Sequence, residues 1–419
     1  MKNRMKKLTA MMLAGVMAFS LTACGSGGDE SKSNSSAKSA TGDKKTIKIT
    51  WWGGQSRHDY TQKLLDAYTE EHPDIKFEGI PAGWDGYFDK LSTQAASGSM
   101  PDIVQMDYLF ISTYAKNGAV ADLQSYIDDG TIDTSNIDDT ILNTGSVDGK
   151  MAGMVLTTSS VATGYNPEVF EKAGLEMPDG TWTWSDFIDA NKKISEMTGQ
   201  ESVLVSSGAT GDVTQLRYWM RQHDEKLFND KGNGLGYKDD KVVADFFKMW
   251  KEMVDNDIYS DPDEEAQIMT KGLESSPVVT GDAGTVFDWN NYSSRVSSVN
   301  DKIRITTPPL SDDTKETGLW NKPGMFFSVA DSSKVKDECA EFIDWFVNSK
   351  EANDIIMAER GTPVSSKVRD EMVESGKLGD QQVEMFEYAD KVTELAEDTP
   401  KPDPEGIAEI GRASCRERV

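Results

Sequence analysis

From residue 46 onward, apolar positions recur first with the period of a strand and then with that of a helix. Residues 46–52 (TIKITWW) alternate like a strand and run into a Gly-Gly turn. Residues 59–71 place two leucines and Tyr68 on one side, which is the spacing of an amphipathic helix, and Pro73 then ends that helix. The chain therefore begins its ordered part with a strand followed by a helix.

The same alternation continues for another 45 residues or so. The pattern predicts a strand over 75–80, a helix over 85–97, a buried strand over 101–106 and a helix over 111–117. Strands and helices that alternate with short connections are typical of a doubly wound α/β unit with a parallel sheet. We therefore predict an α/β fold that starts with such a unit.

Ligands of doubly wound folds bind beyond the carboxyl ends of the strands. Trp52 ends the first predicted strand, Trp84 follows the second and Asp107 follows the third, so the three side chains are expected in one crevice. After the Gly-Gly turn, Gln55 and Arg57 could donate hydrogen bonds to a ligand there, although Arg57 could equally be a solvated surface charge. The Asp107 carboxylate could accept bonds from vicinal hydroxyls or cap the next helix.

The first 45 residues have the composition of an export signal and a tether. Four basic residues precede an apolar run over 8–21, which is shorter than the roughly 20 residues needed to span a bilayer. Small residues precede Cys24, the pattern of a bacterial lipobox, although an ordinary signal peptide with an incidental cysteine would look the same. We predict a lipoprotein signal peptide over 1–23, lipidation of Cys24 and a flexible tether over 24–45.

Charge and cysteine content exclude several classes of function. The chain carries a formal charge of −27, and removal of residues 1–23 would take away four positive charges and no negative ones, leaving a charge near −31. Such a surface repels nucleic acid. No cysteine pair remains for a structural disulfide, and the three histidines are scattered, so we predict no metal site and no cofactor.

Ten tryptophans are many for 419 residues, and several stand at turns or segment ends. A tryptophan offers a broad flat surface that suits the apolar C–H face of a sugar ring. Trp289 stands between Asp288 and Asn290, and Trp320 follows later in the chain. For any single tryptophan, core packing is the competing interpretation. Trp182 and Trp184 are assigned to packing at a helix start and not to the sugar.

Ordered segments of the chain resemble the extracellular solute-binding proteins of carbohydrate ABC transporters, the group that contains maltose-binding protein. TIKITWW, KLLDAYTEEHPDIKFE and GSMPDIVQMD resemble the first lobe, and residues 147–187 are similar to the crossover into the second. GDAGTVFDWN (281–290) resembles the segment that delivers an aromatic side chain to the sugar. WWGGQSRHDYTQ and AGWDGYFDKLSTQ resemble the oligogalacturonide-binding branch. The likeness spans about residues 46–410.

The resemblance implies a periplasmic-binding-protein-like fold of type II, in which two discontinuous doubly wound lobes are joined by hinge strands and close over a sugar. Hinge crossings are expected near 157–161, near 325–329 and after about 369. The lobes are then 46–157 with 330–370, and 158–329 with 371–410. The last nine residues, 411–419 (GRASCRERV), resemble a translated vector junction and are expected to be non-native.

We therefore expect a lipid-anchored monomer on the outer face of the cell membrane that captures an oligosaccharide and delivers it to ABC permease subunits. The ligand would be an oligogalacturonide held by Arg57 and Arg217, or a neutral plant-type glycan. The candidate ligand-binding residues are Trp52, Gln55, Arg57, Trp84, Asp107, Arg217, Trp219, Asp288, Trp289, Asn290 and Trp320. Motifs of serine hydrolases, zinc proteases and P-loop enzymes are absent from the sequence. An extracellular glycoside hydrolase and a peptide-binding lipoprotein are the alternatives.

Overall fold

The computed structural model describes residues 44–205, 214–259 without 230 and 232, 275–313, 316–396, and 399–400. The predicted signal peptide, Cys24 and the tail over 411–419 lie outside the described residues. Among the described helices, none combines the length and the apolar character that crossing a membrane requires.

The first three strands form the predicted parallel sheet. β1 (Lys45–Trp52) lies between β2 (Ile75–Ala82) and β3 (Ile103–Met106) and pairs in parallel with both. Both faces of β3 are buried, as its apolar sequence indicates. The predicted α/β fold and the positions of these strands are confirmed.

The three predicted helices are present, with starts that depend on their capping residues. α1 (Gln55–Glu71) begins four residues earlier than predicted, directly after an extended Gly54. α2 (Tyr87–Ala96) begins later than predicted, after a glycine in the left-handed region. α3 (Tyr108–Lys116) begins three residues early because the Asp107 carboxylate accepts a hydrogen bond from the Leu109 backbone N–H.

The other described elements follow in chain order. Up to the middle of the chain they are α4 (Gln124–Asp128), α5 (Asp139–Leu142), the 3₁₀ turn η1 (Asn143–Gly145), β4 (Ser146–Val147), β5 (Lys150–Met151), β6 (Met154–Tyr165), α6 (Pro167–Lys172), α7 (Trp184–Thr198), β7 (Val203–Val205), α8 (Thr214–Gln222) and α9 (Asp240–Asp255). The later ones are α11 (Pro277–Thr280), β8 (Thr285–Trp289), α12 (Tyr292–Val296), β9 (Arg304–Thr306), β10 (Asn321–Val329), α13 (Lys336–Asn348), α14 (Lys350–Ile356), β11 (Thr362–Pro363), α15 (Ser366–Glu374) and α16 (Asp380–Leu395).

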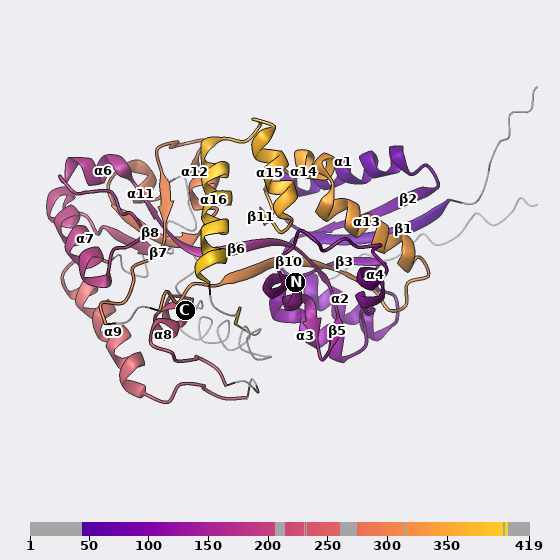
Figure 1. Cartoon of the computed structure of the whole chain (residues 1–419), viewed down its shortest axis with the longest axis horizontal. Coiled ribbons are helices and arrows are strands. Elements are labelled where there is room, and N and C mark those ends of the chain that lie inside the picture. The colour runs from indigo at the N-terminus through magenta and orange to yellow at the C-terminus, as the bar shows by residue number, and fades with distance from the viewer. Residues whose placement is uncertain are drawn as a thin grey trace, which may run out of the picture. The chain divides into compact units, whose positions relative to one another are not determined.

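Two long strands, β6 and β10, connect the parallel strands β1–β3 to the strands of the second region (Figure 1). β10 pairs with β3 and with β6, and β6 pairs in turn with β8. The sheet order is β2-β1-β3-β10-β6-β8-β7, with β9 and β11 also paired to β6. β10 is antiparallel to both β3 and β6. β6 pairs with β10 over residues 154–160 and with β8 over residues 161–165. The two expected hinge segments, 157–161 and 325–329, fall inside β6 and β10.

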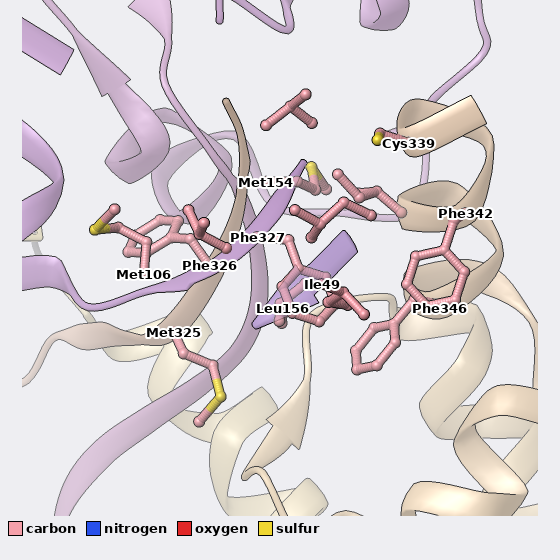
Figure 2. Close-up of a cluster of buried hydrophobic side chains, with 14 of the residues drawn as sticks. Ile49, Met106, Met154, Leu156, Met325, Phe326, Phe327, Cys339, Phe342 and Phe346 are labelled. Atoms are coloured by element: carbon pink, nitrogen blue, oxygen red, sulfur yellow. The ribbon is translucent and has the colours of Figure 1, made fainter. Parts of the chain in front are cut away.

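Buried apolar side chains gather in two large cores. The first core surrounds β1, β3 and the beginning of β6, and it includes Ile49, Phe326 and Phe342 (Figure 2). The second core surrounds β8 and α7, and it includes Phe187 and Phe287. A smaller third cluster lies between α15 and α16. Because β6 and β10 place residues in or beside both large cores, the strands connect two separately packed regions.

The connection from α14 to β11 passes close to β6 through Gly361, whose φ is +116°. A Cβ atom at this glycine would lie 3.1 Å from the Thr158 carbonyl oxygen and 3.4 Å from Thr157 Oγ1. The backbone conformation and the space both favour glycine.

Gly361→Ala is therefore expected to lower the free energy of unfolding by about 3 kcal/mol, since a strained φ and a close contact add. The matched control is Gly376→Ala, where φ is +66° and a Cβ would meet no atom within 4 Å. It should cost only about 1 kcal/mol. Urea unfolding followed by tryptophan fluorescence measures both values, and equal losses would show that the approach to β6 is not tight.

Candidate functional site

An aromatic cluster lies at the carboxyl ends of β1 and β2. The Trp52 ring at the end of β1 is buried, and it meets the rings of Trp84 and Tyr87 edge to face, each with centroids 5.2 Å apart. Trp84 follows β2 and has 37% of its surface exposed. The sequence prediction that Trp52 and Trp84 come together is confirmed, with Trp84 presented to solvent and Trp52 behind it.

The predicted hydrogen-bond donors on α1 bind protein carboxylates. Gln55 Nε2 donates to Asp59 Oδ1 at 2.7 Å. Arg57 forms a two-pronged pair with Glu359, in which Nε lies 3.1 Å from Oε2 and Nη2 lies 3.2 Å from Oε1. Such a pair fixes the guanidinium in orientation as well as position. Tyr60 also donates to Glu359, so the turn that follows α14 holds this cationic group against α1.

Asp107 ends β3 on the same edge of the sheet. Its side chain is half-buried and caps α3, which was one of its two predicted roles. Burial raises the pKa of Asp107, and the positive charge of Lys322 opposes that rise. Lys322 on β10 is therefore an electrostatic neighbour of this carboxylate.

On the other side of β6, a pocket of about 320 Å³, including the open solvent at its mouth, lies against the second core. Its walls are mostly apolar, with four aromatic residues and three polar ones among the ten that line it. The lining residues are Val161, Ala162, Trp184, Thr214, Gln215, Tyr218, Phe287, Asp288, Trp289 and Pro308. A mostly apolar lining with a few polar groups is one feature that small-molecule sites share.

The residues of the 288–290 segment differ in environment although they are adjacent in sequence. Trp289 is half-buried and lines the pocket. The Asp288 carboxylate is buried, with Arg295 Nη1 3.2 Å from its Oδ1. Asn290 is buried behind the pocket, where its Oδ1 accepts from the Ser160 backbone N–H at 3.1 Å and its Nδ2 donates to Thr362 Oγ1 at 3.2 Å.

The structure does not bring Trp219 and Trp320 into the pocket lining. Trp219 on α8 donates through Nε1 to the Val242 carbonyl oxygen at 2.9 Å and packs against the second core. Trp320 is 3% exposed and belongs to that core, with the Arg221 guanidinium 5.6 Å from its ring centroid. Arg217, also on α8, is half-buried. Trp184 is buried at the start of α7, where helix-start packing was predicted, and also forms part of the pocket wall.

Lys322 is a residue of this region that the sequence analysis did not select. It lies on β10, and its Nζ stands 4.7 Å from the centroid of the Trp289 ring. This is the geometry of a cation–π contact. The lysine in WNKPG carries no motif that marks it, since its neighbours follow only from the pairing of β10 with β6.

The described residues after α16 lie between the start of β10 and the start of α3. Thr399 Oγ1 donates to the Asn321 carbonyl oxygen at 2.9 Å, and Tyr108 Oη donates to the Pro400 carbonyl oxygen at 2.8 Å. Asn321 begins β10, and Tyr108 begins α3. Thr399 and Pro400 thus link β10 to the edge of the first sheet beside Asp107.

No group of three or more His, Cys, Asp or Glu side chains suited to holding a metal ion occurs in the part of the chain that the structure describes. The polar groups of the two candidate surfaces are instead amides, hydroxyls and charged pairs. Together with the exposed aromatic faces, they can bind a polar ligand that also has apolar faces.

Comparison with known proteins places the chain among binding proteins. Residues 63–381 match the family described as bacterial extracellular solute-binding protein. The arabinooligosaccharide-binding protein of Bacillus subtilis is 25% identical over 258 residues, which are 60% of this chain and 55% of that protein. The diacetylchitobiose binding protein of Streptomyces coelicolor is 28% identical over 203 residues, 48% of this chain and 45% of that protein. The chain spans about half the length of the curated relatives that it matches.

Two solved structures are similar over nearly the whole chain. A periplasmic oligogalacturonide binding protein from Yersinia enterocolitica, in complex with saturated digalacturonic acid, has a TM-score of 0.72 and 25% identity, and the match covers 88% of this chain and 92% of that one. An extracellular solute-binding protein of family 1 from Alicyclobacillus acidocaldarius has a TM-score of 0.72 and 26% identity, covering 90% and 92%. Both support the type II fold that the sequence predicts.

Asp107→Asn removes the charge of this side chain but keeps its capping role, because asparagine caps a helix about as well as aspartate. The raised pKa of Asp107 means that the folded protein takes up this proton at a higher pH than the unfolded chain, so the wild type gains stability as pH falls through the folded-state pKa. The variant lacks this gain. We expect the variant to be at least as stable as the wild type near about pH 7, with its advantage shrinking toward about pH 4.

Urea unfolding across that pH range measures the difference. Asp138→Asn, at the exposed N-cap of α5, is the control for exchanging a capping aspartate for asparagine. A constant difference between wild type and Asp107→Asn would contradict the assigned burial of the Asp107 carboxylate.

Proposed function

The chain belongs to the bacterial extracellular solute-binding protein family, and on that basis we propose that it captures an oligosaccharide for a carbohydrate ABC importer. Family members and relatives of this chain are binding proteins and not enzymes. We therefore assign no catalytic step to the site and treat the whole chain as a receptor for its ligand.

The observation that carries the proposal is a pair of aromatic surfaces, one on each side of the paired strands β6 and β10. Trp84, backed by Trp52, stands at the edge of the first sheet, and Trp289 lines the pocket beside the second core. Flat rings suit the C–H faces of pyranoses, and nearby carboxylates and amides suit their hydroxyls.

The relatives support an oligosaccharide rather than a monosaccharide. Their names refer to arabinooligosaccharide and diacetylchitobiose, and the Yersinia structure holds digalacturonic acid. A ligand of two or more rings has more than one C–H face, and a site with two aromatic surfaces suits such a ligand. We propose a plant-type glycan, with oligogalacturonide as the first candidate.

Binding would work by closure of the two lobes about β6 and β10. A ligand that contacts both lobes stabilises the closed arrangement by the difference between its contacts in the two states. The permease would then recognise the closed form, in which both lobes present their surfaces together. In this scheme the protein acts as a monomer.

The candidate residues divide by position. We propose that Trp84, Asp107 and Trp289 contact the sugar, since they stand half-buried or exposed at the two surfaces. Gln55, Arg57, Arg217 and Asp288 could donate to it or accept from it if their protein partners rearrange. Four candidates would not touch the sugar but would support the residues that do: Trp52, Trp219, Asn290 and Trp320.

Calorimetric titration against a panel of uronic and neutral oligosaccharides tests the proposal. We expect saturable binding of at least one glycan, with no release of reducing ends. Trp289→Ala should weaken that binding by about 1–3 kcal/mol, because an aromatic anchor loses its stacking face. Trp345→Ala on α13, a half-buried tryptophan packed against Phe342, is the control and should bind normally.

Absence of glycan binding by the wild type would contradict the proposed function. Release of reducing ends would favour the hydrolase alternative, and binding of a peptide panel would favour a peptide receptor. A loss for Trp345→Ala equal to that for Trp289→Ala would mean that the effect is general destabilisation.

We further propose that Cys24 carries a lipid that holds the protein on the outer face of the cell membrane. When the full chain is expressed in a bacterium supplied with labelled palmitate, the wild type should incorporate label and sediment with membranes. Cys24→Ala should do neither and should appear in the soluble extracytoplasmic fraction. A labelled Cys24→Ala protein would contradict the assignment of the anchor.

A further inference from the structure

The cationic side chains near the proposed sugar site differ in whether a protein carboxylate already pairs with them. Two of the arginines nearby are already paired with protein carboxylates. Arg57 pairs with Glu359, and Arg295 pairs with the buried Asp288. An anionic ligand would have to compete with these carboxylates for either guanidinium.

Lys322 differs from both arginines. Its side chain is half-buried, and no carboxylate in the described ranges lies within 4 Å of its ammonium. No oxygen atom of the described residues accepts a hydrogen bond from Nζ, and the ammonium faces the ring of Trp289 instead. An ammonium group has three donors to satisfy, so this one keeps its hydrogen-bonding capacity for water or a ligand.

The backbone holds Lys322 in place on β10. Lys322 pairs with Ser159 of β6, while Trp289 at the end of β8 pairs with Val161, two residues further along the same strand. Side chains two residues apart on a strand share a face. The neighbouring Asn321 is anchored by Ser160 Oγ, which donates to its Oδ1 at 2.7 Å. The ammonium and the indole ring therefore meet because of the register of β6.

Asp107, at the edge of the first sheet, is an electrostatic neighbour of Lys322. The charge of Lys322 is the strongest influence that opposes the effect of burial on the pKa of Asp107. The ammonium thus lies under the influence of both an aromatic ring beside the second core and a carboxylate at the edge of the first sheet. A sugar that stacks on Trp289 from this side must meet Lys322.

We infer that Lys322 is a specificity-determining residue that binds an anionic group, of the carboxylate type found in uronic acids, on a sugar stacked against Trp289. The inference rests on the proposed function and assigns the residue that would distinguish acidic from neutral sugars. An anionic sugar would exchange the cation–π contact for a charge-assisted hydrogen bond. A neutral sugar would displace the ammonium from the ring without that compensation.

The test compares digalacturonic acid with α-1,4-linked galactobiose, its neutral counterpart in which the carboxyl groups are replaced by hydroxymethyl groups. Lys322→Met keeps most of the side-chain length and removes the charge. We expect calorimetry to show binding of digalacturonic acid weakened on the order of tenfold or more. Binding of galactobiose should change by less than about twofold or become tighter, because the ring face is no longer covered.

Lys150→Met is the matched control, since Lys150 is exposed on β5 and its replacement changes the net charge by the same amount. It should bind both sugars as the wild type does. Wild-type affinity for digalacturonic acid should also fall with added salt more steeply than affinity for galactobiose. Thermal unfolding of each variant checks that the fold is retained.

The possible failures can be distinguished. Equal losses for the two sugars, no loss for digalacturonic acid, or a wild type that binds only glycans without an anionic group would overturn the role of Lys322 and leave the proposed function intact. A wild type that binds no glycan at all would overturn the proposed function and this inference with it.

Discussion

The change of partner along β6 is the constraint on which the rest of the structure depends. Up to Ser160 the strand pairs with β10, and from Val161 it pairs with β8. Asn290 occupies the point of change, where its backbone N–H donates to the Ser160 carbonyl oxygen at 2.9 Å and its side-chain oxygen accepts from the Ser160 N–H. The buried side-chain amide thereby satisfies the Ser160 N–H, and the Asn290 backbone N–H satisfies the Ser160 carbonyl oxygen. The positions of Trp289, at the end of β8, and Lys322, on β10, both follow from this register.

A buried arginine, Arg360, likewise joins distant segments of the chain through hydrogen bonds, here beside the first core. Arg360 is 3% exposed, and it donates to Gln105 and Thr61. Its guanidinium lies over the ring of Tyr60, with 5.4 Å to the centroid, and burial lowers its pKa to about 10. Within the described residues no carboxylate forms an ion pair with it, so aromatic faces and neutral oxygens surround the charge. Together with Glu359, which binds Arg57, it fixes the connection between α14 and β11 against α1.

The early part of the fold could be predicted from the sequence because its signals are local. Periodicity placed β1 to β3 and the helices between them, and strand ends placed Trp52, Trp84 and Asp107 on one edge. Asp107 also has the capping role that was weighed for it. Sequence motifs were weaker guides in the later part of the chain, where Trp320 and Asn290 are buried. Whether a tryptophan lines a pocket or a core depends on which strand lies beside it, and that pairing is not encoded locally.

Contacts between distant segments escaped prediction altogether. Arg57 and Glu359 are 302 residues apart, and neither residue carries a pattern that points to the other. Lys322 likewise gains its neighbours only when β10 lies against β6. In the sequence it is one of many lysines, and only the folded chain shows that its ammonium stands over an indole ring.

The path of Thr399 and Pro400 has a practical consequence. These residues bridge Asn321 on β10 and Tyr108 at the edge of the first sheet, so a small fluorophore attached beside them would stand where the two regions meet. Its emission would depend on the angle between the regions and not only on local polarity.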